Sequence, residues 1–387
     1  MQGGIADHTS HLARHLVQAG IEVSVLTSRK ASTGAKSDIP NLKPQISDVE
    51  SPQVYPVIRN WGIGCWRQIG RWLEEYRPGV LHIQYQAAAF DLGGWVNWLP
   101  WWLRRHPTRP RLVVTFHDLR IPYLFPKAGR WRWQSILALA RYADAVVVTN
   151  VEDEQRLQEA GGGWLIRIPL GSNVDVQLPP SYERDGWRAR LGIERQTLLL
   201  AYFGFLNESK GGEELVLALE RLVGQGYDVG LLLMGGQVGD VDATNRAYAG
   251  RVRKLIQARG LEQRVHWTGY TSPEEVSANF LAADVVVMPY RDGASLRRTT
   301  LIAALRHGRP LVTTQPAVPL AELRDGDNAL LVPPGDVTAL AGAVARLAGD
   351  SHLRARLSAG AHALGRQFDW PAIARQTLDL YRRLELE

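Results

Sequence analysis

A lysine followed by two glycines is the first candidate for chemistry. Lys210 lies in the segment FGFLNESKGG, after an apolar run and before a helical pattern. Backbone amides at a helix start attract anions, and a lysine beside them adds positive charge. The sequence therefore predicts a diphosphate site at Lys210. The alternative is a solvated lysine, at a position that the helix dipole disfavours.

Adjacent arginines form the second candidate, in the segment YRDGASLRRTT. Asp292-Gly293 indicates a turn, and Leu301–Leu305 begins an apolar helical face. Arg297 and Arg298 therefore fall near a helix start, where two guanidinium groups beside backbone amides would bind phosphate. The alternative is that one or both pair with acids on the surface.

The first half of the chain offers a glycine pair and a histidine. Gly3 and Gly4 precede a helix, where glycine allows a phosphate to approach the backbone, although plain turns use the same pair. His117 ends the apolar run Leu112–Phe116, and ligands bind beyond the carboxyl ends of parallel strands. Histidine there can donate a hydrogen bond or transfer a proton. The alternative is a loop histidine capped by Asp118.

Other catalytic motifs are missing from the sequence. It has no GxGxxG after a strand, no P-loop and no GxSxG. Asp240-Val-Asp242 and Asp325-Gly-Asp327 have the spacing of some metal-dependent sugar transferases, but both lie in polar turn sequence. We expect no metal and no cofactor.

Strand and helix patterns alternate almost throughout and must position these residues. The apolar runs are continuous, which indicates strands buried on both faces of parallel sheets. About ten such strands fit two doubly wound sheets better than one. The expected strands are 22–27, 80–85, 112–116, 145–149, 198–202, 229–234, 265–268, 284–289, 310–313 and 329–332. The clearest helical periods are 8–18, 66–76, 213–223, 242–258 and 337–348.

A length of 387 residues indicates two domains. The segment 171–190 contains a Pro-Pro pair and no periodicity, which places a linker near Gln177–Tyr182. We expect an N-terminal domain at 1–177, a C-terminal domain at 183–369 and a final helix within 370–387. No strand precedes the first glycine pair, so the first sheet would lack a central strand. We therefore expect a native start upstream, with about 10–20 further residues.

Composition excludes several classes of protein. Apolar residues make up 45% and charged residues 22%, which are ordinary globular values. No apolar run reaches the ~18 residues of a membrane span. The single Cys65 excludes an intrachain disulfide framework, and the start lacks the pattern of a secretory signal, so we expect a cytoplasmic protein.

Tryptophan and arginine are concentrated in one stretch. Residues 101–133 contain eight Arg or Lys against one acid, and residues 94–105 (GWVNWLPWWLRR) combine four tryptophans with two arginines. This composition suits contact with a membrane interface; alternatively the rings line a core helix or an acceptor groove. Nucleic acid is not an expected partner, because the net charge is only +6 and no recognition motif occurs.

Taken together, the segments resemble the retaining family 4 glycosyltransferases over essentially the whole chain. The similar segments occur in the order of that family: GGIADHTSHLARHLVQAGIEVSVLT, VLHIQYQ, VVTFHD, AVVVTN, IPLGSNVD, FGFLNESKGG, LLLMGG, VHWTGYTSPEEV, DGASLRRTT with HGRPLV, and DGDNALLVPPGD. The resemblance implies the α/β GT-B fold, with two Rossmann-like domains that face a cleft. It also implies that the C-terminal helix crosses back to the N-terminal domain.

The resemblance also implies roles for residues. The acceptor would bind the N-terminal domain and the nucleotide sugar the C-terminal one. Lys210 would bind the diphosphate, His117 would contact the donor sugar near the reacting carbon, and the family needs no dedicated metal. The catalytic residues that we expect are His117 and Lys210. The donor-binding residues that we expect are Gly3, Gly4, Phe205, Lys210, Gly269, Tyr270, Ser295, Leu296, Arg297, Arg298 and Thr299.

Two departures from the family pattern affect the donor site. The usual arginine after the glycine of the Lys210 loop is Phe205 here, and Arg297 or Arg298 is our candidate to replace its charge. The positions of the two glutamates that the family usually has are occupied here by Ser295 and Ala303, unless Asp292 substitutes for the first glutamate.

We therefore expect a retaining hexosyltransferase that uses a nucleoside diphosphate sugar and a hydroxyl acceptor. The acceptor is open and includes lipid-linked saccharides, which would place the protein at the inner face of the membrane. The alternatives are a catalytically degenerate nucleotide- or glycan-binding relative and a nucleotide-sugar epimerase.

Overall fold

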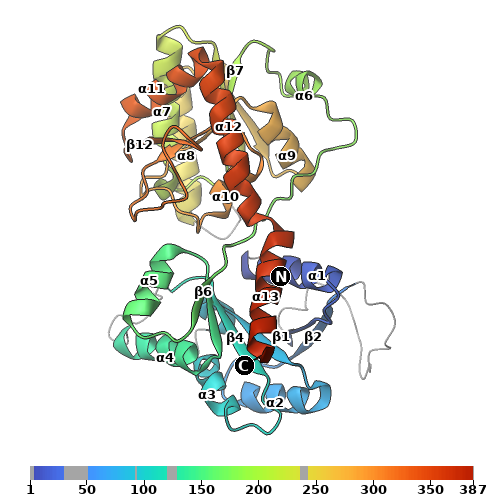
Figure 1. Cartoon of the computed structure of the whole chain (residues 1–387). Coiled ribbons are helices and arrows are strands. Elements are labelled where there is room, and N and C mark those ends of the chain that lie inside the picture. Colours follow the sequence, from blue (N-terminus) through green and yellow to red (C-terminus); the bar gives the residue numbers. More distant parts are fainter. Residues whose placement is uncertain (1–3, 30–50, 92–93, 120–128, 236–242, 387) are drawn as a thin grey trace. The chain divides into compact units, whose positions relative to one another are not determined.

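The computed structural model describes residues 4–29, 51–91, 94–119, 129–235 and 243–386. The chain divides into two compact units (Figure 1). Unit 1 comprises Met1–Leu170 and Trp370–Glu387, and unit 2 comprises Gly171–Asp369. No helix among the described residues has both the length and the apolarity to span a bilayer.

Unit 1 contains two parallel sheets in its described part. Four strands pair in chain order, namely β3 (Val80–Tyr85), β4 (Arg111–Phe116), β5 (Ala145–Val148) and β6 (Leu165–Arg167). A separate pair consists of β1 (Ser24–Ser28) and β2 (Gln53–Ile58). The prediction of parallel strands is confirmed, and that of full burial holds for β5 and for all of β4 except Arg111, whereas β1 and most of β3 are partly buried. Two strands were not predicted from the sequence: β2, half of whose residues are exposed, and β6, which is short.

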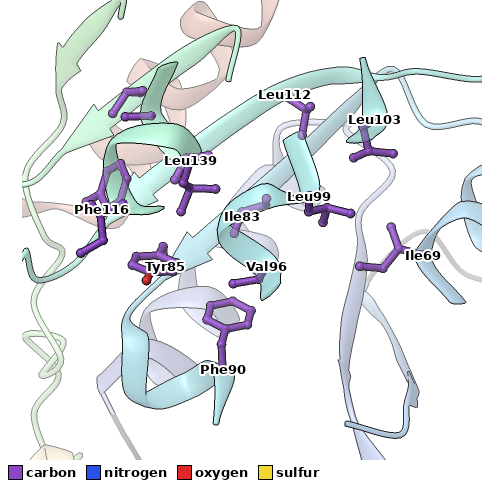
Figure 2. Packing of buried hydrophobic residues seen from close by; sticks show 14 of the residues in the cluster. Ile69, Ile83, Tyr85, Phe90, Val96, Leu99, Leu103, Leu112, Phe116 and Leu139 are labelled. Carbon is purple, nitrogen blue, oxygen red and sulfur yellow. The ribbon is translucent and has the colours of Figure 1, made fainter. Parts of the chain in front are cut away.

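Helices of unit 1 cover these sheets and contribute to two cores. The helices are α1 (Gly4–Gln18), α2 (Gly64–Tyr76), α3 (Leu99–Leu103), α4 (Gly129–Tyr142), α5 (Val151–Glu159) and α13 (Trp370–Leu386), with 3-10 turns η2 (Ala87–Phe90) and η3 (Trp95–Trp98). One core joins α1 and α13 to β4 and β5 through residues such as Leu12, Val113 and Trp370. The other includes Phe90, Val96, Leu99 and Phe116 (Figure 2). The C-terminal helix therefore folds as part of unit 1, beside α1 (Figure 1).

Unit 2 is built on one parallel sheet in the order β12-β11-β10-β7-β8-β9. The strands are β7 (Leu198–Phe203), β8 (Val229–Met234), β9 (Val265–Gly269), β10 (Val285–Met288), β11 (Leu311–Thr314) and β12 (Leu330–Val332). From β7 the chain adds strands on one side and then, at β10, on the other, which is the doubly wound order of a Rossmann fold. The carboxyl ends of β7 and β10 therefore flank the point where ligands bind in such sheets.

The helices of unit 2 are α6 (Arg184–Arg190), α7 (Gly212–Gly224), α8 (Ala243–Ala258), α9 (Pro273–Ala282), α10 (Thr299–Arg306), α11 (Val337–Gly349) and α12 (Ser351–Gly365), with 3-10 turns η5 (Glu208–Lys210), η6 (Glu262–Arg264) and η7 (Arg366–Phe368). Side-chain caps start α6, α9, α11 and α12. Ser272 and Glu275 form a capping box at α9, and the Asp336 carboxylate accepts a hydrogen bond at the start of α11.

The boundary between the units differs from the prediction. The sequence placed the linker at Gln177–Tyr182, but unit 2 begins at Gly171. The cause is hydrogen bonding to residues of unit 2: the Ser172 amide donates to the Phe368 carbonyl at 3.2 Å, and Ser277 Oγ donates to the Asp175 carbonyl at 2.9 Å. The turn-forming residues of 171–190 predicted an irregular segment, but they could not predict which of the two units this segment packs on.

Candidate functional site

Two loops of unit 2 meet at the switch point of its sheet. One follows β7 and contains Lys210, the last residue of η5. The other follows β10 and ends at Arg298, the N-cap of α10. Since β7 and β10 pair directly, the topology brings both predicted cations to the same end of the sheet.

Lys210 is held against the end of β7. A Cβ atom on Gly204 would lie 3.1 Å from Lys210 Nζ and 2.9 Å from Thr300 Cγ2. Gly204 itself has a φ of +118°, so this close approach requires a glycine. Burial, together with the charge of Arg298, lowers the pKa of Lys210 to about 8. The ammonium is therefore close to its titration point in the absence of an anion.

Arg298 is fixed by two side-chain contacts within its own loop. Its guanidinium carbon lies 4.2 Å from the ring centroid of Tyr290, and its Nη2 donates to an Asp292 oxygen. The Tyr290 hydroxyl lies 3.0 Å from Thr300 Oγ1, which connects the aromatic platform to the first turn of α10. Two cations, Lys210 and Arg298, therefore lie near a helix start, an arrangement suited to a diphosphate.

A glycine after Lys210 sets the distance between the two loops. Gly211 has a φ of +69°, and a Cβ atom there would lie 1.9 Å from the carbonyl oxygen of Pro289. No side chain fits in that space. Gly211 therefore lets the Lys210 loop contact the backbone that follows β10.

The sequence analysis missed Arg291, the first arginine of YRDGASLRRTT. Its guanidinium binds Glu214 Oε1 at 2.6 Å and Glu213 Oε2 at 2.8 Å, and its amide donates to the Ser209 carbonyl at 2.8 Å. Arg291 thus connects the loop after β10 to the start of α7. The available sequence signal was the pair of acids in the first turn of α7, Glu213 and Glu214.

The remaining predicted donor residues of unit 2 are distributed around these loops. The Arg297 amide donates to Ser295 Oγ at 3.3 Å, Leu296 is buried, and Thr299 begins α10. Phe205 follows Gly204 and is about half exposed. After β9 the chain turns at Gly269, with a φ of +68°, and presents Tyr270 as an exposed ring.

In unit 1, His117 directly follows β4, as predicted from the sequence. Its Nε2 lies 2.8 Å from Gln84 Oε1, and its ring contacts His8 of α1 edge-on at 4.6 Å. Burial lowers the pKa of His117 to about 4, so the ring is neutral at neutral pH. An amide oxygen can only accept a hydrogen bond, so Nε2 carries the proton and Nδ1 is an acceptor. Gly3 lies outside the described residues, and Gly4 is the first residue of α1.

Further ring contacts of unit 1 involve His8, the ring that contacts His117, and were not revealed by local sequence patterns. Trp370 of α13 contacts His8 edge-on and stacks on His11, each at 5.0 Å. His82 of β3 bonds Tyr381 OH at 2.6 Å and Thr115 Oγ1 at 2.7 Å. Burial lowers the pKa of His82 to about 3. His8, His82 and His117 of unit 1 are thus uncharged at neutral pH, because burial lowers the pKa of each.

The acidic pairs considered for metal binding make other contacts or lie outside the described residues. Asp325 Oδ1 accepts from the Leu331 amide at 2.8 Å, and Asp327 pairs with Arg324 at 2.8 Å. Asp240-Val-Asp242 falls in an undescribed segment. Within the described ranges no group of three or more His, Cys, Asp or Glu side chains could hold a metal ion.

Two protein families match the chain, one in each unit. The family of glycosyl transferases group 1 matches residues 183–363. The glycosyl transferase 4-like domain matches residues 3–171.

Named relatives match over nearly the full length. A D-inositol 3-phosphate glycosyltransferase of Corynebacterium glutamicum is 30% identical over 399 residues, which cover 98% of this chain and 91% of the relative. A phosphatidyl-myo-inositol mannosyltransferase of Mycobacterium leprae is 27% identical, with 98% and 92% covered.

Solved structures share the fold. Sucrose-phosphate synthase from Thermosynechococcus elongatus matches with a TM-score of 0.73 at 24% identity, over 99% of this chain and 94% of that one. Anabaena Alr3699/HepE in complex with UDP and glucose matches with a TM-score of 0.70 at 18% identity, over 98% and 96%. The chain therefore belongs to the group 1 glycosyltransferases of the GT4 type and has their two-domain GT-B fold.

Proposed function

We propose that this glycosyltransferase moves a hexosyl group from a nucleoside diphosphate sugar to a hydroxyl acceptor, with retention of anomeric configuration. The observation that carries the proposal is the pair of cations, Lys210 and Arg298, at the switch point of unit 2. Positive charge fixed at that place matches a leaving diphosphate, whose charge increases in the transition state.

Lys210 and Arg298 are the proposed diphosphate contacts. The loop after β7 has Phe205 at the position where the family usually has an arginine. Arg298, in the loop after β10, supplies the positive charge instead. The free amides of α10, including that of Thr299, add donors beside it. No metal is part of the proposal, because two cations and a helix start already provide the stabilising charge.

His117 is proposed to contact the donor sugar. A neutral imidazole whose Nε2–H donates a hydrogen bond to Gln84 Oε1 presents Nδ1 as a hydrogen-bond acceptor for a sugar hydroxyl. Gly3, Gly4, Gly269 and Tyr270 remain proposed donor contacts on the basis of the resemblance.

The acceptor is proposed to be a hydroxyl of a polyol or a lipid-linked polyol. The relatives named above act on D-inositol 3-phosphate or carry phosphatidyl-myo-inositol in their names. Both compounds present secondary ring hydroxyls, so a free and a lipid-linked acceptor should be tested side by side. UDP-sugars are the first donors to test, because a structural neighbour was solved with UDP.

The test is product analysis with the full chain. The protein is incubated with UDP- and GDP-hexoses and with either acceptor, and NMR reports the anomeric configuration of the product. An α-linked product from an α-linked donor, lost in Lys210→Met and His117→Ala, is the expected result. An inverted product would overturn the retaining mechanism.

A degenerate binding protein is the second candidate. The second glutamate position of the family is Ala303, which is fully buried in α10 and offers no hydrogen-bond acceptor. Nucleotide binding without any transfer or donor hydrolysis in an overnight incubation would favour this candidate. A product that remains a nucleotide sugar would instead indicate an epimerase.

A further inference from the structure

One short segment of unit 1 is anchored in the core by the apolar side chains of its inner face. It comprises η3 and α3, residues 95–103. Val96, Leu99 and Leu103 are at most 2% exposed and point into the core beside Ile83 and Phe90 (Figure 2). These three side chains anchor the segment, so its stability does not require large apolar residues on the other side.

The outer face nevertheless carries a row of tryptophans. Trp95, Trp98 and Trp101 follow one another at intervals of three residues and are 42%, 40% and 39% exposed. Residues three apart lie on the same side of a helical segment. Large apolar rings gathered on one exposed face mark an interaction site more often than single exposed rings do.

The row is supported from behind by further tryptophans. The Trp66 ring of α2 stacks on Trp102 at 6.0 Å, and its Nε1 donates to the Trp95 carbonyl at 3.0 Å. A Cβ atom on Gly70 would lie 2.9 Å from Trp102 Cη2, so α2 packs closely on α3. These contacts hold the outer rings on a fixed base.

Positive charge adjoins the row. Arg104 and Arg105 follow α3, are exposed, and the Arg105 guanidinium carbon lies 5.0 Å from the Trp101 ring centroid. The sequence from 94 to 117 contains no Asp or Glu. Two acids of the described chain contact this region: Glu74 pairs with His106 at 3.5 Å and Asp144 pairs with Arg109, so neither pair involves Arg104 or Arg105. The face therefore combines indole rings with guanidinium groups.

We propose that Trp95, Trp98, Trp101, Arg104 and Arg105, the tryptophan–arginine surface, dock unit 1 on an anionic lipid bilayer. Indole rings insert at the level of the headgroups, where an apolar body and a polar N–H are both accommodated. Guanidinium groups pair with lipid phosphates and are attracted by the negative surface potential. The surface goes beyond the proposed sugar transfer, because docking requires neither donor nor acceptor.

Vesicle co-sedimentation of the full chain tests the proposal. The vesicles are phosphatidylcholine alone and an equimolar mixture with phosphatidylglycerol, at low and high salt. We expect sedimentation with the anionic vesicles, weakened by salt because screening reduces charge attraction. Trp98→Ala with Trp101→Ala, and separately Arg104→Gln with Arg105→Gln, should each lower the partition coefficient by about tenfold or more.

Matched variants keep the test specific. Trp164 in unit 1 is 36% exposed and lies outside the surface, so Trp164→Ala should leave sedimentation unchanged. Arg253 lies 4.9 Å from the Trp267 ring in unit 2, which makes Arg253→Gln the control for Arg105. Melting curves of every variant verify that the chain is folded.

Two results would overturn the proposal. One is a wild-type chain that stays in the supernatant with anionic vesicles, or folded variants that sediment as well as wild type. The other is a dimeric wild type that the same substitutions make monomeric, with vesicle binding unchanged, which would make this face a protein interface. Loss of sugar transfer with intact sedimentation would contradict only the proposed function.

Discussion

Lys210 and Arg298 are two positive charges kept close together in a partly dehydrated site. Burial, and after it the charge of Arg298, raises the free energy of the charged state of Lys210. An anion that binds between them relieves both costs. The sequence predicted both residues as phosphate contacts from helix-start patterns. It could not predict Tyr290 and Asp292 as partners of Arg298, because those contacts depend on how the loop folds.

The lowered pKa of Lys210 predicts a pH dependence. Its pKa of about 8 means that the ammonium is charged below this pH and loses its proton above it. The kcat/KM for the donor, which reports the free enzyme, should therefore fall above pH 8, by up to tenfold per pH unit. The arginine in Lys210→Arg keeps its charge throughout this pH range, so this variant should not show the fall in kcat/KM above pH 8. A wild-type profile that stays flat to pH 9.5 or so would contradict the assignment.

At the scale of elements, the site depends on how close two loops can approach. The apolar runs predicted β7 and β10 to within one residue at each end, and the turn Asp292-Gly293 lies where it was expected. The sequence could not reveal that Gly211 touches the Pro289 carbonyl, because these residues are far apart along the chain. Arg291 was missed for the same reason, since its acidic partners lie in α7.

Gly211→Ala should therefore destabilise unit 2 and weaken donor binding. The clash at 1.9 Å forces the Lys210 loop away from the strand end. Gly192→Ala is the matched control, since Gly192 has a similar φ of +72° and nothing within 4 Å of an added Cβ. The control should cost about 1–2 kcal/mol for the left-handed backbone alone. Urea unfolding should show a clearly larger loss for Gly211→Ala, and equal losses would contradict the steric argument.

At the scale of the whole molecule, the end of the chain completes the first unit. Pro371 predicted where α13 begins, and only the family resemblance implied that it returns to the N-terminal domain. His82 and Tyr381 are 299 positions apart, so no local pattern could pair them. Burial keeps His82 and His117 uncharged at neutral pH, which makes the stability of unit 1 depend on pH.

Unit 1 should lose stability as the pH falls below about 6.5, the ordinary histidine pKa. Below this pH the two histidines are protonated in the unfolded chain. In the folded chain His82 and His117 stay neutral until the pH approaches their lowered pKa values of about 3 and about 4. Each histidine should cost about 1.4 kcal/mol per pH unit within that window. Urea unfolding followed by tryptophan fluorescence reports mainly on unit 1, which holds eleven of the thirteen tryptophans. His82→Gln should reduce the pH slope, and an unchanged slope would contradict the account.

Calorimetric titration with UDP and GDP tests the central claim most directly. Wild type should bind one of these diphosphates with a favourable enthalpy and bind the matching nucleoside far more weakly. Lys210→Met and Arg298→Ala should each raise the Kd of the diphosphate by about tenfold or more, the scale of a lost charge-assisted hydrogen bond. Their effect on the nucleoside should be small. Equal diphosphate affinity in wild type and both variants would contradict the placement of the donor at Lys210 and Arg298.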